Sequence, residues 1–313
     1  GIGMSVVVLC GGVGAARFLS GLLQVVDSAD ATAIVNTGDD LRLHGLHISP
    51  DLDTVTYTLA GAVNPETGWG LRGETWAAMT ALDRYGGQSW FRLGDQDLAT
   101  HLYRTQRLAD GATLSEVTSE IAGACGLGLR LLPMSDDLVA TRVTVAGGDE
   151  ITFQDYFVAR RHDVEVTAVR FAGVEQARPA PGVLDAINDA QSIVIAPSNP
   201  IVSIGPILAV PGIRPAIEAR RDDVVAVSPI IAGAALKGPA DRLLTELGHE
   251  ASVVGVARLY AGLAGTLVVD EADAGLASAI EAEGLRCVVA PTIMRGPAEA
   301  AALARTVLDA APA

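Results

Sequence analysis

The pattern of apolar and polar positions predicts alternating strands and helices at both ends of the chain. Residues 6–9 form an apolar strand run, residues 10–14 a glycine-rich turn, and an apolar helical spacing follows as far as Val26. With a second strand run at 32–35, this order predicts a βαβ unit. The alternation of strands and helices returns after residue 183. Strands are expected at 192–196, 224–228, 252–256, 266–269 and 287–290, and helices at 240–247, 272–283 and 298–308.

The middle of the chain has a different pattern. Helical spacing dominates at 54–59, 74–85, 97–108 and 114–124, and Thr113 and Glu116 have the spacing of a capping box at the start of the last helix. No strand is expected between 54 and 132, whereas residues 138–145 and 150–158 alternate around a Gly-Gly-Asp turn and predict a hairpin. We therefore predict an α/β core at 1–53 and 133–313 with a smaller helical lid subdomain at 54–132.

Composition agrees with this fold class and limits the kinds of partner that the protein is expected to bind. Half of the 313 residues are hydrophobic but only 4% are aromatic, which favours a parallel sheet between helices over an all-β sandwich. The formal charge of −15 repels nucleic-acid backbones and anionic lipids, so we expect no nucleic acid and no membrane as partners. A local pocket can still bind a small phosphate ligand. Three scattered cysteines, no long apolar run and no signal-peptide pattern predict a soluble, cytoplasmic protein.

The glycine turn is the first candidate binding site. Gly11, Gly12 and Gly14 allow the backbone to approach a phosphate, and the helix after them directs free N–H groups towards it. A nicotinamide dinucleotide fingerprint requires a small residue where Arg17 stands and an acid where Asn36 stands, so both residues argue against that cofactor. Arg17 in a first helical turn fits a bound anion, because the helix dipole otherwise disfavours a cation there. The alternative is a tight turn with a solvated arginine.

Four aspartates form the second candidate, which is a metal site. Asp39 and Asp40 follow a predicted strand, and Asp51 and Asp53 follow Pro50. Mg²⁺ binds to carboxylate oxygens and to the oxygens of a pyrophosphate, so these three groups are expected in one site. In an extended segment Asp51 and Asp53 share a face, whereas on a helix they diverge. The alternative is that Asp51 is a helix N-cap and Asp53 suits the first turn, and the pattern leaves both interpretations open.

Loops after the later strands offer further polar groups. Ser198 and Asn199 lie in a Pro-Ser-Asn-Pro loop after the run 192–196, and similar loops lie at 228–233 and 133–137. Ligands of open α/β sheets bind outside the carboxyl ends of the strands, so base or phosphate contacts are plausible here. Ser, Asn and Pro are also ordinary turn residues.

Histidines and tryptophans carry weaker signals. His101 is expected to be structural, and neither a catalytic triad nor a zinc pattern is found. The tryptophans fall in the predicted lid, where they can stack on a flat ligand or fill a core: Trp69, Trp76 and Trp90.

Taken together, these segments resemble the 2-phospho-L-lactate transferase family of coenzyme F-420 biosynthesis (the CofD/FbiA type). The resemblance runs along nearly the whole chain, in GGVGAARFLSGL, IVNTGDDLRLHGLHISPDLDTVTYTLAG, LGDQDLATHLYRTQ, LRLLPMSDD, ITFQDYFV, IVIAPSNPIVSIGPILAVPGIR and VAVSPIIAGAALKGPAD. It implies a Rossmann-like core with a smaller helical part. It also implies magnesium-dependent transfer of a phosphoester group from a guanosine diphosphate-linked three-carbon acid to the deazaflavin Fo, with release of GMP.

The resemblance also assigns residues by motif. Asp53 and Arg92 are expected to contact the deazaflavin, and Asp53 and Asp51 to act in catalysis. The nucleotide part of the donor is expected to be held by Gly11, Gly12, Gly14, Arg17, Asn36, Ser198 and Asn199. The metal candidates are Asp39, Asp40 and Asp51. Gln96 stands where many relatives have Arg, which weakens the case for an anion contact there.

Two other functions compete with the transferase. A non-catalytic UDP-sugar-binding regulator of the same superfamily also has a glycine turn and paired aspartates, but it does not account for SPDLDT together with LGDQD. A nicotinamide dehydrogenase is disfavoured by Arg17 and Asn36. A homodimer is expected because small symmetric assemblies are common. The sequence leaves open whether the donor carries phospholactate, phosphoenolpyruvate or phosphoglycerate.

Overall fold

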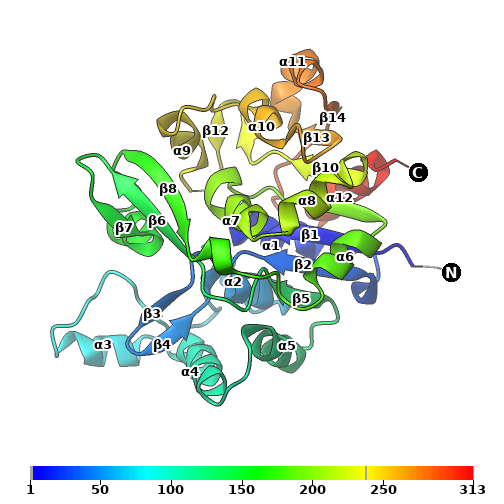
Figure 1. Cartoon of the computed structure of the whole chain (residues 1–313). Helices are drawn as coiled ribbons and strands as arrows, with labels where there is room; N and C mark the ends of the chain where they lie inside the picture. The colour runs from blue at the N-terminus through cyan, green and yellow to red at the C-terminus, as the bar shows by residue number, and fades with distance from the viewer. Residues whose placement is uncertain (1–2, 237, 313) are drawn as a thin grey trace.

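The protein is built on a seven-stranded parallel sheet, seen in a computed structural model that describes residues 3–236 and 238–312 (Figure 1). The strand order is β14-β13-β10-β9-β1-β2-β5, and every pairing in it is parallel. The strands are β1 (Val6–Cys10), β2 (Ala31–Val35), β5 (Arg130–Pro133), β9 (Ser192–Ile195), β10 (Val224–Val227), β13 (Thr266–Val269) and β14 (Arg286–Val289). The chain reverses its direction of strand addition between β1 and β9, which is where open α/β sheets bind ligands. The predicted α/β, Rossmann-like fold class is confirmed.

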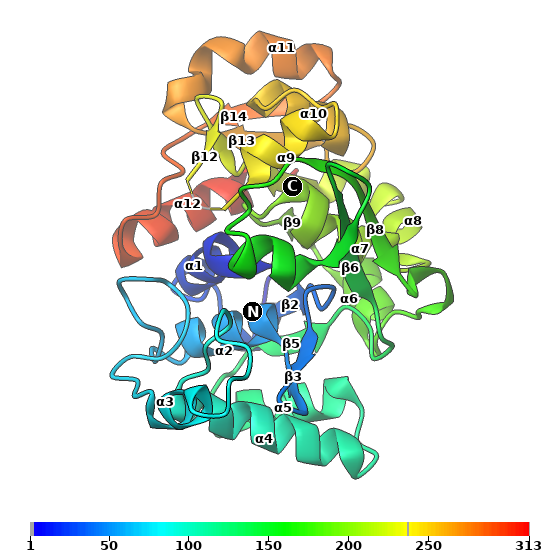
Figure 2. The same cartoon turned by 90° about the vertical axis from the view of Figure 1, so that its left-hand side faces the viewer.

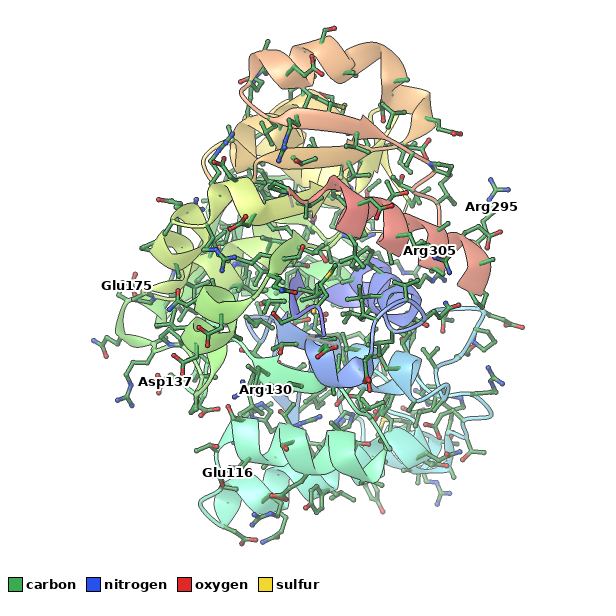
Figure 3. The ribbon with its side chains drawn as sticks, turned by 90° about the vertical axis from the view of Figure 1, so that its right-hand side faces the viewer. Glu116, Arg130, Asp137, Glu175, Arg295 and Arg305 are labelled. Atoms are coloured by element: carbon green, nitrogen blue, oxygen red, sulfur yellow. The ribbon has the colours of Figure 1, made fainter. Side chains whose placement is uncertain are left out.

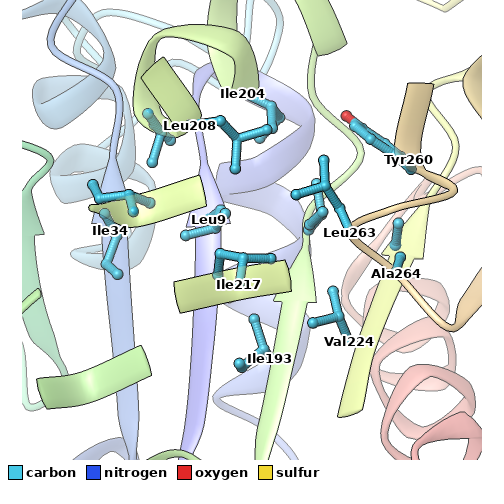
Figure 4. Close-up of a cluster of buried hydrophobic side chains, with 14 of the residues drawn as sticks. Leu9, Ile34, Ile193, Ile204, Leu208, Ile217, Val224, Tyr260, Leu263 and Ala264 are labelled. Carbon is cyan, nitrogen blue, oxygen red and sulfur yellow. The ribbon is translucent and has the colours of Figure 1, made fainter. Parts of the chain in front are cut away.

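Both faces of the sheet are covered by helices, so its central strands are buried and apolar on both sides. In β1, Val7 and Leu9 point into one core and Val6 and Val8 into the other. The first core is closed by α6 (Val183–Asp189), α7 (Gly205–Ala209), α8 (Ile213–Glu218), α9 (Ala240–Glu246), α10 (Val253–Tyr260) and α11 (Ala277–Ala282) (Figure 4). The second is closed by α1 (Gly12–Leu22), α2 (Pro50–Leu59), α5 (Leu114–Ala124) and α12 (Pro297–Ala310).

Smaller elements surround the carboxyl edge of the sheet. A hairpin of β3 (Leu41–Leu43) and β4 (Leu46–Ile48) lies beside α4 (Asp95–Ala109), and α3 (Ala77–Asp83) lies near both (Figure 2). A separate antiparallel sheet contains β6 (Ala140–Val145), β7 (Glu150–Thr152) and β8 (Val166–Ala172). A two-stranded ribbon joins β11 (Ile230–Ile231) to β12 (Ala234–Ala235). Charged side chains such as Glu116 and Glu175 lie on the outer surface (Figure 3).

Predictions at two places outside the expected lid were wrong. The strand expected at 252–256 is the start of α10, because the Ser252 hydroxyl accepts hydrogen bonds from the backbone N–H groups of Val254 and Gly255 and so caps a helix. The second strand of the expected hairpin ends at Thr152 and is followed by a π-helical turn at Asp155–Ala159. The partner that completes this sheet is β8, which no prediction covered.

The borders of the predicted lid cut through two elements. Helix α2 begins at Pro50 and packs on α1, so it spans the border at 53/54. Strand β5 spans the border at 132/133 and pairs with β2 in the main sheet, so the expectation of no strand before 133 was wrong. Helices α3, α4 and α5 lie together at one end of the molecule (Figure 2). The division into core and lid stays a prediction.

Among the residues described, no helix combines the length and the hydrophobicity that a membrane crossing requires.

Candidate functional site

A large cavity of about 1340 Å³ opens at the carboxyl edge of the sheet, between the strand ends and the helices at 77–109. It is lined by eleven of the twelve residues predicted for the site: Gly11, Gly12, Gly14, Arg17, Asn36, Asp39, Asp51, Asp53, Arg92, Ser198 and Asn199. Asp40 is the exception. Residues that are far apart in the sequence therefore converge on one space.

The glycine turn brings three segments into close contact. An added Cβ at Gly11 would lie 2.7 Å from Oδ2 of Asp51, and one at Gly14 would lie 2.7 Å from the backbone oxygen of Pro197. Gly12 has a φ of +81°, which favours glycine. The backbone N–H of Gly11 donates to Oγ of Ser198 at 3.3 Å. The absence of side chains thus allows the end of β1 to contact both α2 and the loop after β9.

A pair of buried carboxylates lies beside this turn. Nδ2 of Asn36 lies 3.1 Å from Oδ2 of Asp51 and 3.5 Å from Oδ1 of Asp39, so one amide serves both acids. Oδ1 of Asn36 is held by the N–H of Gly38 at 2.8 Å, which fixes the orientation of the amide. Burial raises the pKa of Asp39 well above its usual range, and the neighbouring Asp51 raises it further. Burial also raises the pKa of Asp51 to about 6, although the hydrogen bond from Asn36 opposes this shift.

These residues fit a hard divalent cation. Asp39 and Asp51 are buried together, and among the described residues no lysine or arginine forms an ion pair with either. Two neighbouring carboxylates repel each other unless a proton or a cation lies between them. Carboxylate oxygen is also the ligand that such cations prefer. Asp40 is oriented elsewhere, since its Oδ2 lies 2.9 Å from Nε2 of His47 and accepts from Oγ of Ser49 at 2.7 Å.

Asp53 lies on another face of α2, because that segment is helical. The interpretation of the segment around Asp51 and Asp53 as extended was wrong. The interpretation of Asp51 as the helix N-cap was also wrong, because the N-cap is Ser49. Oδ1 of Asp53 accepts a hydrogen bond from Nη2 of Arg104. Burial raises the pKa of Asp53, and the Arg104 guanidinium opposes this shift.

Helix α4 contributes a buried polar network that surrounds Asp53. His101 was expected to be structural, yet it lines the cavity, and its Nε2 lies 2.9 Å from Oδ2 of Asp97. The hydroxyl of Tyr57 donates to Oδ1 of Asp97 at 2.5 Å. Burial would raise the pKa of Asp97, but the hydrogen bonds from His101 and Tyr57 and the nearby positive charge of Arg104 together outweigh burial, so the pKa lies below its usual value. Asp53, Asp97 and His101 are close enough to share a metal ion, but Arg104 already supplies a positive charge here.

Aromatic side chains form the walls of the cavity beyond Asp53. The segment between α2 and α4 contributes Trp69, Trp76, Trp90 and Phe91. The segment after β7, which includes the π-helical turn, contributes Phe153 and Phe157, whose rings stack 5.5 Å apart. Arg92 lies among them, and its Nη1 is 3.4 Å from Oδ2 of the half-exposed Asp83. This half of the cavity is suited to a flat ligand that carries a hydroxyl or a carbonyl group.

The other half has the features of a phosphate site. Arg17 lines it, and no hydrogen bond or ion pair of Arg17 is found within 3–236 and 238–312. Oδ1 of Asn199 is used as a cap, because it accepts from the backbone N–H groups of Ile201 and Val202. The interpretation of Asn199 as an ordinary turn residue is therefore correct for its Oδ1 atom. Sequence reasoning missed Tyr57, Asp97 and Arg104 as parts of the site.

Comparison with known proteins assigns the chain to a family. The sequence model of the family described as "2-phospho-L-lactate transferase CofD" matches residues 6–293. The chain belongs to this family. A phosphoenolpyruvate transferase of Streptomyces griseus is 50% identical over 98% of each chain, and one of Kitasatospora aureofaciens is 47% identical over 97% of each. A solved structure of a UPF0052 family member from Bacillus halodurans has a TM-score of 0.63 at 18% identity, covering 98% of this chain and 99% of the other, and it supports the fold alone.

Membership of the CofD family settles the class of activity. The chain is a transferase of coenzyme F-420 biosynthesis. The resemblance stated from the motifs is therefore confirmed, and none of these comparisons favours the non-catalytic UDP-sugar-binding regulator.

Proposed function

We propose that the enzyme transfers a phosphoenolpyruvyl or phospholactyl group from a guanosine diphosphate-linked donor to the ribityl hydroxyl of the deazaflavin Fo. The hydroxyl oxygen attacks the phosphorus that carries the three-carbon acid, the bond from that phosphorus to the bridging oxygen breaks, and GMP leaves. The hydroxyl proton passes to a carboxylate or to solvent. The products are a phosphodiester of Fo and GMP.

One observation carries this proposal: a single cavity contains both a phosphate half and an aromatic half. The glycine turn, Arg17 and Ser198 line the first half, and the tryptophans and Arg92 line the second. Transfer between two bound ligands requires that both reach the same point, and positioning supplies much of the catalysis of such reactions. Helix α2 lies between the halves, with Asp51 facing one and Asp53 facing the other.

The roles of individual residues follow from this arrangement. Asp39 and Asp51, oriented by Asn36, are suited to hold Mg²⁺ beside the glycine turn, where it would offset the charge of the diphosphate. The N–H groups at the start of α1, together with Arg17, would bind phosphate oxygens. Asp53 would accept a hydrogen bond from the attacking hydroxyl and orient it. GMP is a good leaving group, so a strong base is not required.

The proposal is tested by mixing the purified enzyme, Mg²⁺ and Fo with each of the three guanosine diphosphate donors and following the products by mass spectrometry. We expect an Fo phosphoester and an equal amount of GMP, and the fastest donor identifies the acid. The names of the relatives favour the phosphoenolpyruvyl donor. Absence of product with every donor would refute the proposal. A homodimer, also proposed, is checked by light scattering on the same sample.

The role of Asp53 is tested by Asp53→Asn, which keeps the size of the side chain and a partner for Arg104. We expect kcat to fall at least about 100-fold with the fold intact. Asp110→Asn is the matched control, because Asp110 is an exposed aspartate at the end of α4. Full activity of the Asp53 variant would remove it from the mechanism.

A further inference from the structure

The two oxygens of Asp53 are in different environments. Oδ1 accepts the hydrogen bond from Nη2 of Arg104. Oδ2 is buried and has no hydrogen-bond partner in the part of the chain that the structure describes, and Nδ1 of His101 lies 3.6 Å from it. Leaving a buried carboxylate oxygen without a hydrogen-bond donor is costly, so this oxygen calls for a partner. Since Asp53 lines the cavity, a ligand can provide that partner.

The Arg104 side chain is buried and is held by contacts to several elements. It is 1% exposed, and it does not line the cavity. Its Nη1 donates to the backbone oxygen of His47 at 3.2 Å and lies 3.3 Å from Nδ1 of His101. Strand β4 and helix α4 therefore hold the guanidinium, which in turn holds Asp53 on α2.

We propose that Arg104 is a positioning residue, which engages Oδ1 of Asp53 and leaves Oδ2 free to accept the hydroxyl of the acceptor substrate. Without Arg104, rotation of the Asp53 side chain would let either oxygen turn towards His101. The attacking hydroxyl would then lose its fixed partner. This inference rests on the proposed function, because it requires a hydroxyl-bearing acceptor in the aromatic half.

A simple alternative is that Arg104 only joins α4 to α2 as a buried ion pair. Removing one partner of such a pair is destabilising in any case. A loss of activity alone therefore does not separate the two roles. A double-mutant cycle with Asp53 does, when thermal unfolding is measured beside kcat for each variant. Positioning couples the two residues in the kcat of the folded enzyme, whereas a purely structural ion pair couples them in stability and leaves that kcat unchanged.

The experiment measures kcat and the KM of the donor for Arg104→Met and Arg104→Lys, each in the wild-type and Asp53→Asn backgrounds. In the wild-type background we expect Arg104→Met to lower kcat about 100-fold with the KM of the donor nearly unchanged, since a misplacement of about 1 Å has that effect. Arg104→Lys should recover part of the loss, because a lysine restores the charge and one donor. In the Asp53→Asn background both changes should alter kcat less than about threefold.

The matched control is Arg107→Met. Arg107 lies one turn further along α4 and pairs with Glu120 of α5 outside the cavity, so kcat should stay close to wild type. Equal losses from Arg104→Met in both backgrounds, or no rescue by lysine, would overturn the inference. If Arg104→Met does not fold, the cycle is completed with Arg104→Lys. Failure of the wild-type enzyme to modify Fo would instead refute the proposed function, and the inference with it.

Discussion

Replacing Gly11 with alanine tests whether the glycine turn and the Asp51 carboxylate act as one site. Gly11 has φ −164° and ψ 140°, an extended conformation that alanine adopts without strain. Any effect of the methyl group therefore comes from contact with its neighbours. The new Cβ would lie 2.7 Å from Oδ2 of Asp51, 3.0 Å from Cβ of Ser203 and 3.3 Å from Cβ of Asn36.

The size of the effect follows from these distances. Ordinary contact begins at 3.4 Å, so the Asp51 oxygen has to retreat by about 0.7 Å, and the backbone of α2 limits that movement. Overpacking of this kind costs about 1–3 kcal/mol of stability. A shift approaching 1 Å in a group that positions substrate or metal costs about 10- to 100-fold in rate. We expect kcat to fall by that factor and the Mg²⁺ concentration for half-maximal activity to rise.

The assay combines transferase kinetics over a Mg²⁺ titration with thermal unfolding. Gly123→Ala is the matched control: Gly123 is helical in α5 and has no atom within 4 Å of the new methyl group. It should leave kcat unchanged and gain up to about 1 kcal/mol of stability. If Gly11→Ala loses stability but keeps the wild-type kcat and Mg²⁺ dependence, then contact between the turn and Asp51 does not serve catalysis, and the reasoning is refuted.

Three further predictions concern pH, ligand binding and helix capping. Burial raises the pKa of Asp51 from its ordinary 3.8 to about 6. On raising the pH, the unfolded chain therefore releases this proton at a lower pH than the folded protein does. The metal-free protein should accordingly lose roughly 3 kcal/mol of unfolding free energy as pH rises from about 4 to about 6. Urea unfolding in EDTA measures this loss, which Mg²⁺ should reduce. Asp51→Asn should also reduce it, and the remainder should come from Asp39, whose pKa is raised as well. Because all three tryptophans line the cavity, Fo should quench their fluorescence on titration, and an unchanged signal would argue against binding in the aromatic half. Thr113→Ala removes the hydroxyl that accepts from the N–H of Glu116 at the start of α5 and should cost about 1 kcal/mol in thermal unfolding, with a loss below about 0.3 kcal/mol counting against the cap.

Most of the sheet could be predicted from sequence because its central strands are short apolar runs buried on both faces, whereas β5 at one edge was missed. Such a run in β1, followed by glycines and an amphipathic helix, is typical of the start of a βαβ unit. The same signal failed at 252–256, where valines start a helix. Periodicity does not separate a buried strand from a buried helix in so short a run, and the Ser252 cap decided the outcome. Strand β8 was missed because its central residues are partly exposed and carry no clean alternation.

Sequence patterns indicated the residues of the glycine turn and of the loops at strand ends, but not the polar residues of α4. Asp97, His101 and Arg104 follow one another at intervals of four and three along α4, so they share a face of the helix. Polar residues on the buried face of a helix were a signal that sequence reasoning could have used. Their partner Asp53 lies on another element, however, and the spacing within α4 does not reveal which element that is.

The LGDQD motif shows why a motif is not always a ligand site. The side chain of Asp95 accepts hydrogen bonds from Thr75 and from the backbone N–H groups of Ala77 and Ala78, so it caps α3. In exchange, Glu74 accepts from the N–H groups at the start of α4. The two helices thus cap each other, and the first acid of the motif is structural. The substitution at Gln96 falls between this cap and Asp97, so it leaves both the cap and the buried network in place.

Helix α2 explains how two aspartates separated by one residue serve different ends of the cavity. Each residue of an α-helix advances by roughly 100°, so Asp51 and Asp53 point about 200° apart. Asp51 therefore meets Asn36 and the glycine turn, which belong to the sheet, whereas Asp53 meets Arg104 of α4. The positions of the two carboxylates depend on different neighbours, although one helix carries both. A change confined to α4 should accordingly alter handling of the acceptor and spare Mg²⁺ dependence, and a change at the glycine turn should do the reverse.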